Sequence, residues 1–328
     1  MFYFIANIHS RSGQSMKAWE KISRRLNERE VSAQIHMTRF AGHAVQLADQ
    51  LSDRAAADFD CCGLRSTIVA VGGDGTFNEV INGMHDFDKV NLAMIPLGSG
   101  NDLGRGLGIT NKDPLARLED ILTDCHDRER AAESESRVRR MDLGRVELDD
   151  GNSRLFAISC GMGFDAAVCR GVDHMYMKGI LNKLHLGRLS YLTKTLQTIL
   201  SMPLYRGRVF YRKEKGRSCL EVENMIFVAA MNQVAEGGGV PMYPGANAFD
   251  GKFGICLADS VPRLLALIML PGFLFRMHKI LPGVHQIETK SLQIHMEEAL
   301  PVHSDGEDLG MHRKIRITCL PGKLRIFI

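Results

Sequence analysis

A segment at residues 69–84, VAVGGDGTFNEVINGM, places one carboxylate among glycines between an expected strand and an expected helix. Residues 66–71 are short, apolar and β-branched, which predicts a buried strand, and the apolar spacing from Phe77 to Met84 predicts a helix. Unpaired N–H groups at a helix start favour an anion, and glycines let the backbone approach a phosphate closely. A tight turn that needs positive φ angles would explain the glycines but not Asp74, whereas a phosphate site explains both.

A second glycine-rich segment, IPLGSGNDLGRGLGI at residues 95–109, again follows an expected strand and precedes an expected helix. Asn101 and Asp102 stand near the expected helix start, and Ser99 can donate a hydroxyl hydrogen bond to phosphate. A capped helix after a glycine turn is the alternative. No Lys-Ser or Lys-Thr pair follows either loop, so neither is a Walker loop, and the dinucleotide-binding fingerprint fits only approximately.

A carboxylate next to phosphates is repelled unless a cation lies between them. Asp74 therefore predicts Mg²⁺, held directly or through an ordered water. Asp102 is a candidate for the same network, with helix capping as the alternative.

Expected strands and helices alternate through the first 125 residues, which predicts a parallel sheet covered on both faces. Ligands of such sheets bind beyond the carboxyl ends of the strands, so the loops at 7–13, 72–76 and 97–102 should converge. The charged stretch DRERAAESESRVRR at 127–140 indicates a domain boundary. Beyond it we expect mainly antiparallel strands with inserted helices, one of them at about 173–200.

Composition limits the classes of protein that fit. The chain has 328 residues, 45% of them hydrophobic and 24% charged, which suits one large or two ordinary globular domains. A net charge of +3 argues against a dedicated nucleic-acid binder. The eight cysteines show no CxxC spacing and no signal peptide is apparent, so we expect reduced thiols in a cytoplasmic protein, with a zinc site as a lesser alternative.

Taken together, the motifs resemble the diacylglycerol kinase catalytic-domain family, which includes soluble bacterial lipid kinases and the sphingosine and ceramide kinases. The resemblance rests on GGDGTFNEVING, PLGSGNDLGRGLG, NIHSRSGQSMKAWEKI, ISCGMGFDA, EGGGVPMYPGANAFDG and VHSDGEDLG. It implies an α/β N-terminal domain with a parallel sheet, like that of NAD kinase and phosphofructokinase, and a β-rich antiparallel sandwich with inserted helices. The implied division is 1–132 plus a returning strand at about 317–328, and 133–316, with an active-site cleft between the two domains.

The resemblance also implies roles for individual residues, with ATP and Mg²⁺ as cofactors. Glu307 aligns with the proton acceptor, and His303 is a rival base because an imidazole titrates nearer neutral pH. Asp250 aligns with a magnesium-associated aspartate, assisted by carbonyl groups near Asn247 and Lys252. Nucleotide contacts are implied at Asn7, Ser12, Gly13, Thr38, Gly72, Gly73, Asp74, Gly75, Thr76, Phe77, Asn78 and Ser99.

Three positions depart from the family pattern. Ser99 stands where threonine is common and keeps the hydroxyl. Phe249 stands where a second aspartate is common, which predicts a weaker metal site. NIHSRSG lacks the proline usual in the opening turn.

A lipid kinase must also reach a bilayer, and three segments could serve. Residues 177–196 outline a basic amphipathic helix, and residues 205–217 carry six basic residues and one glutamate; ordinary solvated faces are the alternative for both. Residues 264–275 are apolar but broken by Pro271 and Gly272, too short to cross a bilayer. They predict either a core helix or a surface that meets lipid.

The leading hypothesis is therefore an ATP- and Mg²⁺-dependent lipid kinase that converts diacylglycerol to phosphatidic acid in transient contact with the membrane. A sphingoid-base kinase, an NAD kinase and a catalytically silent lipid-binding regulator are the alternatives. No nucleic-acid partner is expected. The sequence leaves the oligomeric state open, a homodimer included.

Overall fold

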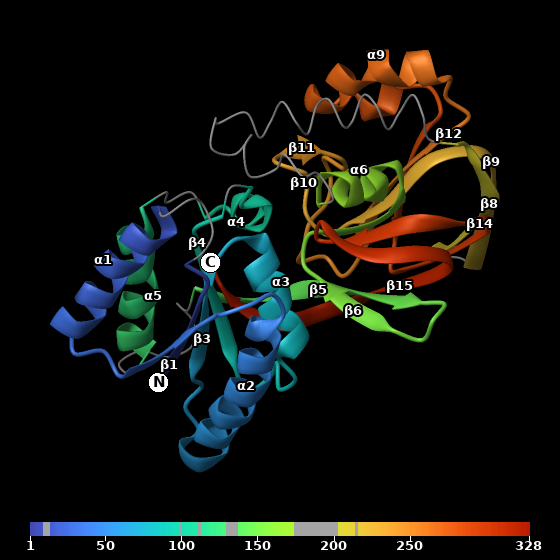
Figure 1. Cartoon of the computed structure of the whole chain (residues 1–328). Coiled ribbons are helices and arrows are strands. Elements are labelled where there is room, and N and C mark those ends of the chain that lie inside the picture. The colour runs from blue at the N-terminus through green and yellow to red at the C-terminus, as the bar shows by residue number, and fades with distance from the viewer. Residues whose placement is uncertain (9–13, 99, 110–112, 129–136, 174–202, 214–215) are drawn as a thin grey trace. The chain divides into compact units, whose positions relative to one another are not determined.

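The structure is a computed structural model, and it describes residues 1–8, 14–98, 100–109, 113–128, 137–173, 203–213 and 216–328 (Figure 1). The chain forms two compact units, Met1–Met141 with Gly322–Ile328, and Asp142–Pro321. We call them unit 1 and unit 2. Strands β5 and β15 pass from one unit into the other along the chain. The boundary expected at 132–133 lies outside the described residues.

Unit 1 contains the alternating strands and helices of the first part of the chain. Its elements are β1 Phe2–Ala6, α1 Gln14–Glu28, β2 Ala33–Met37, α2 His43–Cys62, β3 Thr67–Gly72, α3 Asp74–Gly83, β4 Asn91–Pro96, α4 Asp102–Gly106 and α5 Pro114–Arg128. Strands β2, β1, β3 and β4 pair parallel in that order, and Ile326 of β15 pairs with Leu92 beside them.

Strands β1, β3 and β4 of unit 1 are buried on both faces, which explains why they are almost wholly apolar, whereas the edge strand β2 is partly exposed and carries Gln34 and His36. Figure 1 shows α1 and α5 on one face and α2 and α3 on the other. On the first face, Trp19 and Ile22 of α1 and Leu118 of α5 pack against alternate strand residues such as Phe4 and Val69. The sequence predicts a helix from His43 to Leu51, but α2 is longer, because the alanine-rich segment after Leu51 continues the helix until Gly63 ends it at φ 72°.

The end of β15 is fixed in unit 1 by a buried arginine. Arg117 of α5 is 3% exposed and donates hydrogen bonds to the carbonyl oxygens of Met94, at 3.1 Å, and Phe327, at 2.8 Å. Its guanidinium also lies 4.9 Å from the centre of the Phe327 ring. Burial lowers the pKa of Arg117 to about 10, so the side chain stays charged at neutral pH.

Unit 2 is mostly antiparallel. Its elements are β5 Val138–Leu148, β6 Ser153–Phe156, β7 Ser159–Gly163, α6 Phe164–Asp173, β8 Tyr205–Lys213, β9 Gly216–Met231, β10 Ala235–Glu236, β11 Val240–Pro241, β12 Phe253–Asp259, α9 Arg263–Leu274, η3 His278–Ile280, β13 Val284–Thr289, β14 Ser291–Ser304 and β15 Glu307–Phe327. The sequence predicts a single strand at 286–296, but the structure has two strands there: β13 pairs with β12, and β14 pairs with β15. The helix expected at about 173–200 lies almost wholly outside the described residues.

Strand β9 separates two apolar clusters of unit 2 because its side chains alternate between faces. Val228 and Ala230 belong to the larger cluster, in which the rings of Phe156 and Phe253 stack at 5.4 Å. Phe227, Ala229 and Met231 face the second cluster, which helix α9 covers with Phe273. Both faces of the C-terminal part of β9 are thus buried.

Candidate active site

The loops after β1, β2, β3 and β4 leave the same edge of the parallel sheet, since these strands run in one direction. Asn7 follows β1, and its side chain donates to the Thr76 hydroxyl at 3.2 Å. The Leu97 amide after β4 donates to the Gly72 carbonyl at 2.7 Å. The expected convergence of the three glycine-rich and polar loops is confirmed for their described residues. We call this the glycine-loop edge.

The two glycine loops touch through their backbones. A Cβ built on Gly98 would lie 2.5 Å from the Cα of Gly73, which is closer than real Cβ atoms approach. Neither position therefore accepts a side chain without movement of the backbone. The glycines at 73 and 98 are explained by this close approach, and not by a positive φ angle.

Asp74 begins helix α3 and links the two loops. One carboxylate oxygen accepts the Asp102 N–H at 2.9 Å, and the other accepts the Leu103 N–H at 3.3 Å. The carboxylate thus serves as the cap that α4 lacks, because the N-cap residue Asn101 makes no capping bond. Each carboxylate oxygen can accept more than one hydrogen bond, so Asp74 can still take a cation or water.

Asp102 is buried and its carboxylate pairs with Arg105, one turn along the same helix. A Cβ built on Gly100 would lie 3.4 Å from an Asp74 oxygen and 3.8 Å from an Asp102 oxygen. The two aspartates predicted to act together therefore both lie next to the position that a side chain at Gly100 would occupy. This arrangement can hold one cation between carboxylates, or water.

The remaining predicted nucleotide contacts fall into three groups. Thr38 is buried at the end of β2, where its N–H donates to the Ala6 carbonyl at 3.0 Å. Gly75 is half-buried in the first turn of α3, and Phe77 and Asn78 of the same helix are buried. Ser12, Gly13 and Ser99 lie outside the described residues.

In unit 2, the predicted base Glu307 opens strand β15 just after a tight turn. Ser304 pairs with Glu307 across that turn, and Glu307 is exposed. Asp305 adopts φ 50°, and its carboxylate accepts the N–H groups of Ala157, Ile158 and Ser159 at 2.8–3.0 Å. Three bonds to one carboxylate anchor the turn to the segment between β6 and β7. Glu307 is thus an exposed carboxylate on a well-fixed backbone.

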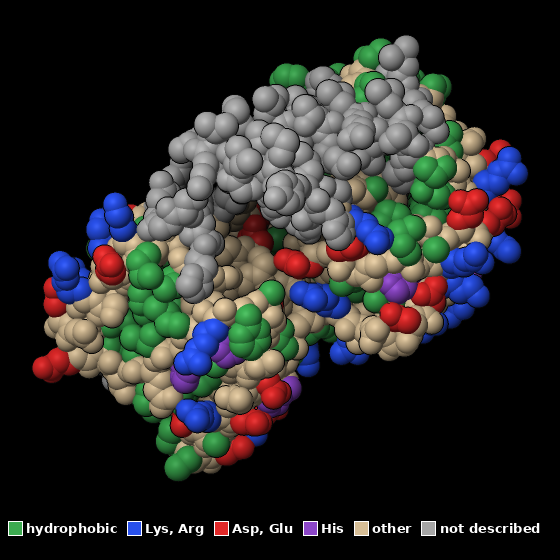
Figure 2. Space-filling model, in the orientation of Figure 1, with side chains coloured by type: hydrophobic (Ala, Val, Ile, Leu, Met, Phe, Trp, Pro, Cys, Tyr) green, Lys and Arg blue, Asp and Glu red, His purple; other side chains and the backbone are tan. Residues whose placement is uncertain are grey.

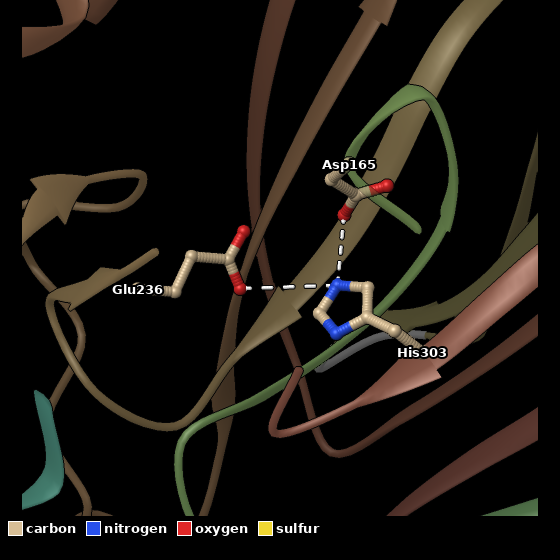
Figure 3. A group of neighbouring side chains, drawn as sticks. All are labelled: Asp165, Glu236 and His303. Atoms are coloured by element: carbon tan, nitrogen blue, oxygen red, sulfur yellow. Dashed lines mark hydrogen bonds and ion pairs between the residues drawn. The ribbon is translucent and has the colours of Figure 1, made fainter. Parts of the chain in front are cut away.

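His303, the rival base, is buried near the end of strand β14. Its Nε2 lies 3.1 Å from Asp165 Oδ2 and 3.9 Å from Glu236 Oε2 (Figure 3). We call these three side chains the His303 cluster. A Cβ on Gly161 would lie 1.9 Å from Asp165 Oδ2 and 2.6 Å from His303 Nε2. Only glycine leaves room for the pair.

The protonation of His303 depends on opposing groups. Burial disfavours the charged imidazolium, whereas Asp165, Glu236 and Asp305 favour it, and together they raise the pKa of His303 to about 9. The Gly306 N–H approaches Nδ1 at 3.3 Å, which favours the neutral ring. We take the carboxylates to prevail, because buried charges interact more strongly than one long neutral hydrogen bond.

Among the described residues, the three side chains of the His303 cluster could hold a metal ion, because their ligand atoms all lie within 4.8 Å of one another. Two carboxylates and one imidazole can hold a divalent cation or a shared proton. Sequence reasoning missed Asp165 and Glu236, since neither lies in a metal-binding spacing. The glycines at 161 and 237–239 were the available signal.

The predicted metal residues lie elsewhere in unit 2. Asp250 accepts the Lys252 N–H at 3.2 Å, and the Lys252 ammonium pairs with both Asp250 and Glu288. Burial raises the pKa of Asp250, and Lys252 opposes this rise through its N–H and its charge. Asn247 is exposed, and its side-chain oxygen accepts the Phe249 N–H. Magnesium binding by Asn247, Asp250 and Lys252 stays a prediction.

The expected lipid-facing segments are only partly described. Residues 177–196 lie outside the described residues. Residues 205–213 form β8, in which Arg206, Arg208 and Arg212 are exposed while Tyr205 and Val209 are buried, as in an ordinary amphipathic strand. In the part of the chain that the structure describes, no helix is both long and apolar enough to cross a bilayer.

Two family descriptions match this chain. Residues 1–133 match the diacylglycerol kinase catalytic domain, and residues 158–328 match the YegS C-terminal NAD kinase β-sandwich-like domain. A Bacillus subtilis protein named as a lipid kinase, YtlR, is 26% identical over 99% of this chain and 98% of its own length. Bacillus subtilis diacylglycerol kinase is 27% identical over 84% of this chain and 79% of its own.

A solved structure named for a diacylglycerol kinase, from Bacillus anthracis str. Sterne, shares the fold. Its TM-score is 0.72 at 21% identity, over 99% of this chain and 96% of the other. The order of an α/β unit and a β-rich unit agrees with both matched descriptions. This chain therefore belongs to the family of diacylglycerol kinase-like and YegS-like lipid kinases.

Proposed function

We propose that the protein is an ATP- and Mg²⁺-dependent kinase that transfers a phosphoryl group to the free hydroxyl of diacylglycerol and yields phosphatidic acid. The observation that carries this proposal is the glycine-loop edge, where Gly73 and Gly98 meet and Asp74 joins the two loops. Its support from relatives is the diacylglycerol kinase name that one of them carries.

The residues of the glycine-loop edge suit the phosphates of ATP. Glycine at 73 and 98 lets the two loops meet through their backbones, and the N-terminus of α3 favours negative charge. Asp74 and Asp102 supply oxygen ligands of the kind that Mg²⁺ prefers. Bound ATP, with Mg²⁺ on its phosphates, would supply the transferable phosphoryl group.

The residues of the chain then have separate tasks. Gly72, Gly73 and the start of α3 would hold the phosphates in place, and Asp74 would keep the two loops in register through Asp102 and Leu103. Glu307 would take the proton of the lipid hydroxyl as its oxygen forms a bond to the γ-phosphorus and the bond to the ADP oxygen breaks. Positioning and charge neutralisation supply most of the catalysis in phosphoryl transfer.

A panel of acceptors tests the proposal. The protein would be incubated with labelled ATP, with and without Mg²⁺, and with diacylglycerol, sphingosine, ceramide, undecaprenol or NAD. We expect label in phosphatidic acid only when Mg²⁺ and diacylglycerol are present, and none with Asp74→Asn. Label in another lipid would show that this lipid, and not diacylglycerol, is the acceptor. Labelling of NAD, or of no acceptor, would overturn the proposal.

A further inference from the structure

Helix α9 is apolar on its exposed face as well as on its buried face. Met269 and Phe273, one turn apart, are 6% and 8% exposed, and Phe273 packs in the second apolar cluster of unit 2. Ile268 of α9 and Phe275, the residue that follows the helix, are 67% and 75% exposed. An ordinary surface helix carries polar residues there.

The apolar surface continues into η3. Met277 is 43% exposed and Ile280 is 70% exposed. Between them His278 is buried, with its ring 4.7 Å from the Phe273 ring in an edge-on contact, which fixes η3 against α9. We call Ile268, Phe275, Met277 and Ile280 the α9 ridge. Green hydrophobic side chains are visible along the upper edge of Figure 2, where α9 lies in Figure 1.

All the Asp, Glu, Lys and Arg residues of the segment around α9 and η3 are basic ones. Residues 260–287 contain no Asp or Glu, but they contain Arg263, Arg276 and Lys279. Arg276 is exposed within the α9 ridge. An apolar ridge with basic and no acidic residues is complementary to an anionic lipid surface, whose headgroups attract cations and whose acyl region accepts apolar side chains.

We infer that the α9 ridge is the surface through which this protein docks on an anionic bilayer, with α9 lying in the plane of the membrane. The inference rests on the proposed function, because a diacylglycerol acceptor lies in such a bilayer. Helix α9, Arg263–Leu274, is too short to span the hydrocarbon core, so it inserts only its exposed side chains. Exposed apolar patches of this kind mark interaction sites.

Vesicle binding tests the inference without any turnover. The full chain would be sedimented without ATP in the presence of phosphatidylcholine vesicles, alone or mixed with phosphatidylglycerol. We expect Phe275→Glu/Ile280→Glu to weaken binding to the mixed vesicles roughly 30-fold or more, since two apolar contacts are lost. Arg276→Gln should cost about fivefold on mixed vesicles and nothing on neutral ones.

A matched control is Leu64→Glu/Met311→Glu, which changes two exposed apolar residues elsewhere and should bind like wild type. Unchanged vesicle binding by the Phe275→Glu/Ile280→Glu variant would overturn the inference. It would also be overturned if the wild type were a dimer in solution and this variant dissociated the dimer but still bound vesicles. Far-UV circular dichroism and melting would verify that each variant is folded.

Activity on dispersed short-chain diacylglycerol separates this inference from the proposed function. If wild type phosphorylates that acceptor but the ridge variant binds vesicles normally, the docking surface is wrong and the function stands. If ridge-dependent vesicle binding is found but no lipid is phosphorylated, the function is wrong and the surface stands as a lipid-binding site.

Discussion

The glycine-loop edge of unit 1 assembles from short loops that each follow a strand of one parallel sheet. The His303 cluster of unit 2 instead takes its side chains from helix α6, the two-residue strand β10 and the end of β14. In the first, backbone contacts between Gly73 and Gly98 set the geometry. In the second, long-range side-chain contacts set it, as between Asp165 and His303, which are 138 residues apart in the chain.

The comparison teaches that the two sites depend on different kinds of residue. At the glycine-loop edge, the absence of side chains and one bridging carboxylate bring the loops together. In the His303 cluster, three titratable side chains interact in a buried place, and Gly161 makes room for two of them. We expect changes at the first site to act mainly on turnover, and changes at the second to act mainly on stability.

The largest effect is expected from Asp74→Asn. Turnover should fall by roughly 10³-fold or more, because fixed charges aimed at the reacting groups usually supply most of an enzyme's rate enhancement. Melting should change little, since an amide oxygen can still accept one of the two N–H groups. Initial rates with labelled ATP and diacylglycerol, with thermal melting, measure both.

Glu79→Gln is a matched control for Asp74→Asn. Glu79 lies on the same helix, and its carboxylate also accepts two backbone N–H groups, those of Gly42 at 2.9 Å and Ala44 at 3.1 Å. If both variants lose turnover equally, Asp74 acts only as a helix cap and our assignment of its catalytic role is wrong.

The next effect concerns Glu307→Gln. We expect turnover to fall roughly 10²–10⁴-fold while ATP affinity stays the same, because glutamine keeps the shape and removes the basicity. His303→Gln tests the rival base, and it should lower the melting temperature more than it lowers the turnover of the protein that remains folded. A greater loss of turnover in folded His303→Gln would move the base to His303.

Gly161→Ala should damage stability rather than chemistry. The added methyl group would lie 1.9 Å from Asp165 Oδ2, so the pair must separate or the backbone must shift. We expect a loss of roughly 3 kcal/mol in the free energy of unfolding, at the upper end for overpacking in a core. Denaturant titration measures it. Gly151→Ala, which changes an exposed turn glycine at φ 88°, is a milder comparison. Equal losses in both would contradict a special requirement at Gly161.

The smallest effect is a pH dependence of stability. Asp165, Glu236 and Asp305 raise the pKa of His303 to about 9, above the unfolded value of 6.5. The resulting stabilisation is fully present below pH 6.5 and is lost as the pH rises through about 9. Burial of the thiols raises the pKa of Cys160 and of Cys256, so these neighbouring groups stay neutral over that range.

Asp165→Asn should flatten this pH dependence. Up to roughly 2 kcal/mol of the decline in unfolding free energy between pH 6.5 and 9 should disappear, because the strongest partner of His303 loses its charge. Denaturant titrations at several pH values measure the slope. An unchanged slope would show that His303 is neutral throughout, with its Nδ1 accepting the Gly306 N–H.

Sequence by itself determined the parts of this protein that depend on neighbouring residues. Short apolar, β-branched runs and helical spacings identified the elements of unit 1, and the glycines with Asp74 identified the edge of the sheet where loops meet. Parallel strands carry their carboxyl ends to one edge whatever the side chains are, so that inference needed no tertiary structure. The family resemblance also came from these local motifs.

Only the tertiary structure decided which distant residues meet. It showed that Asp74 caps α4 through Asp102 and Leu103, and that residues 286–296 divide between two strands on different partners. It placed Asp165 and Glu236 beside a buried His303, and it left one apolar face of α9 exposed. These outcomes depend on long-range pairing and on burial. Neither is encoded in the spacing of nearby residues, because the same apolar or acidic side chain can lie in a core or on a surface.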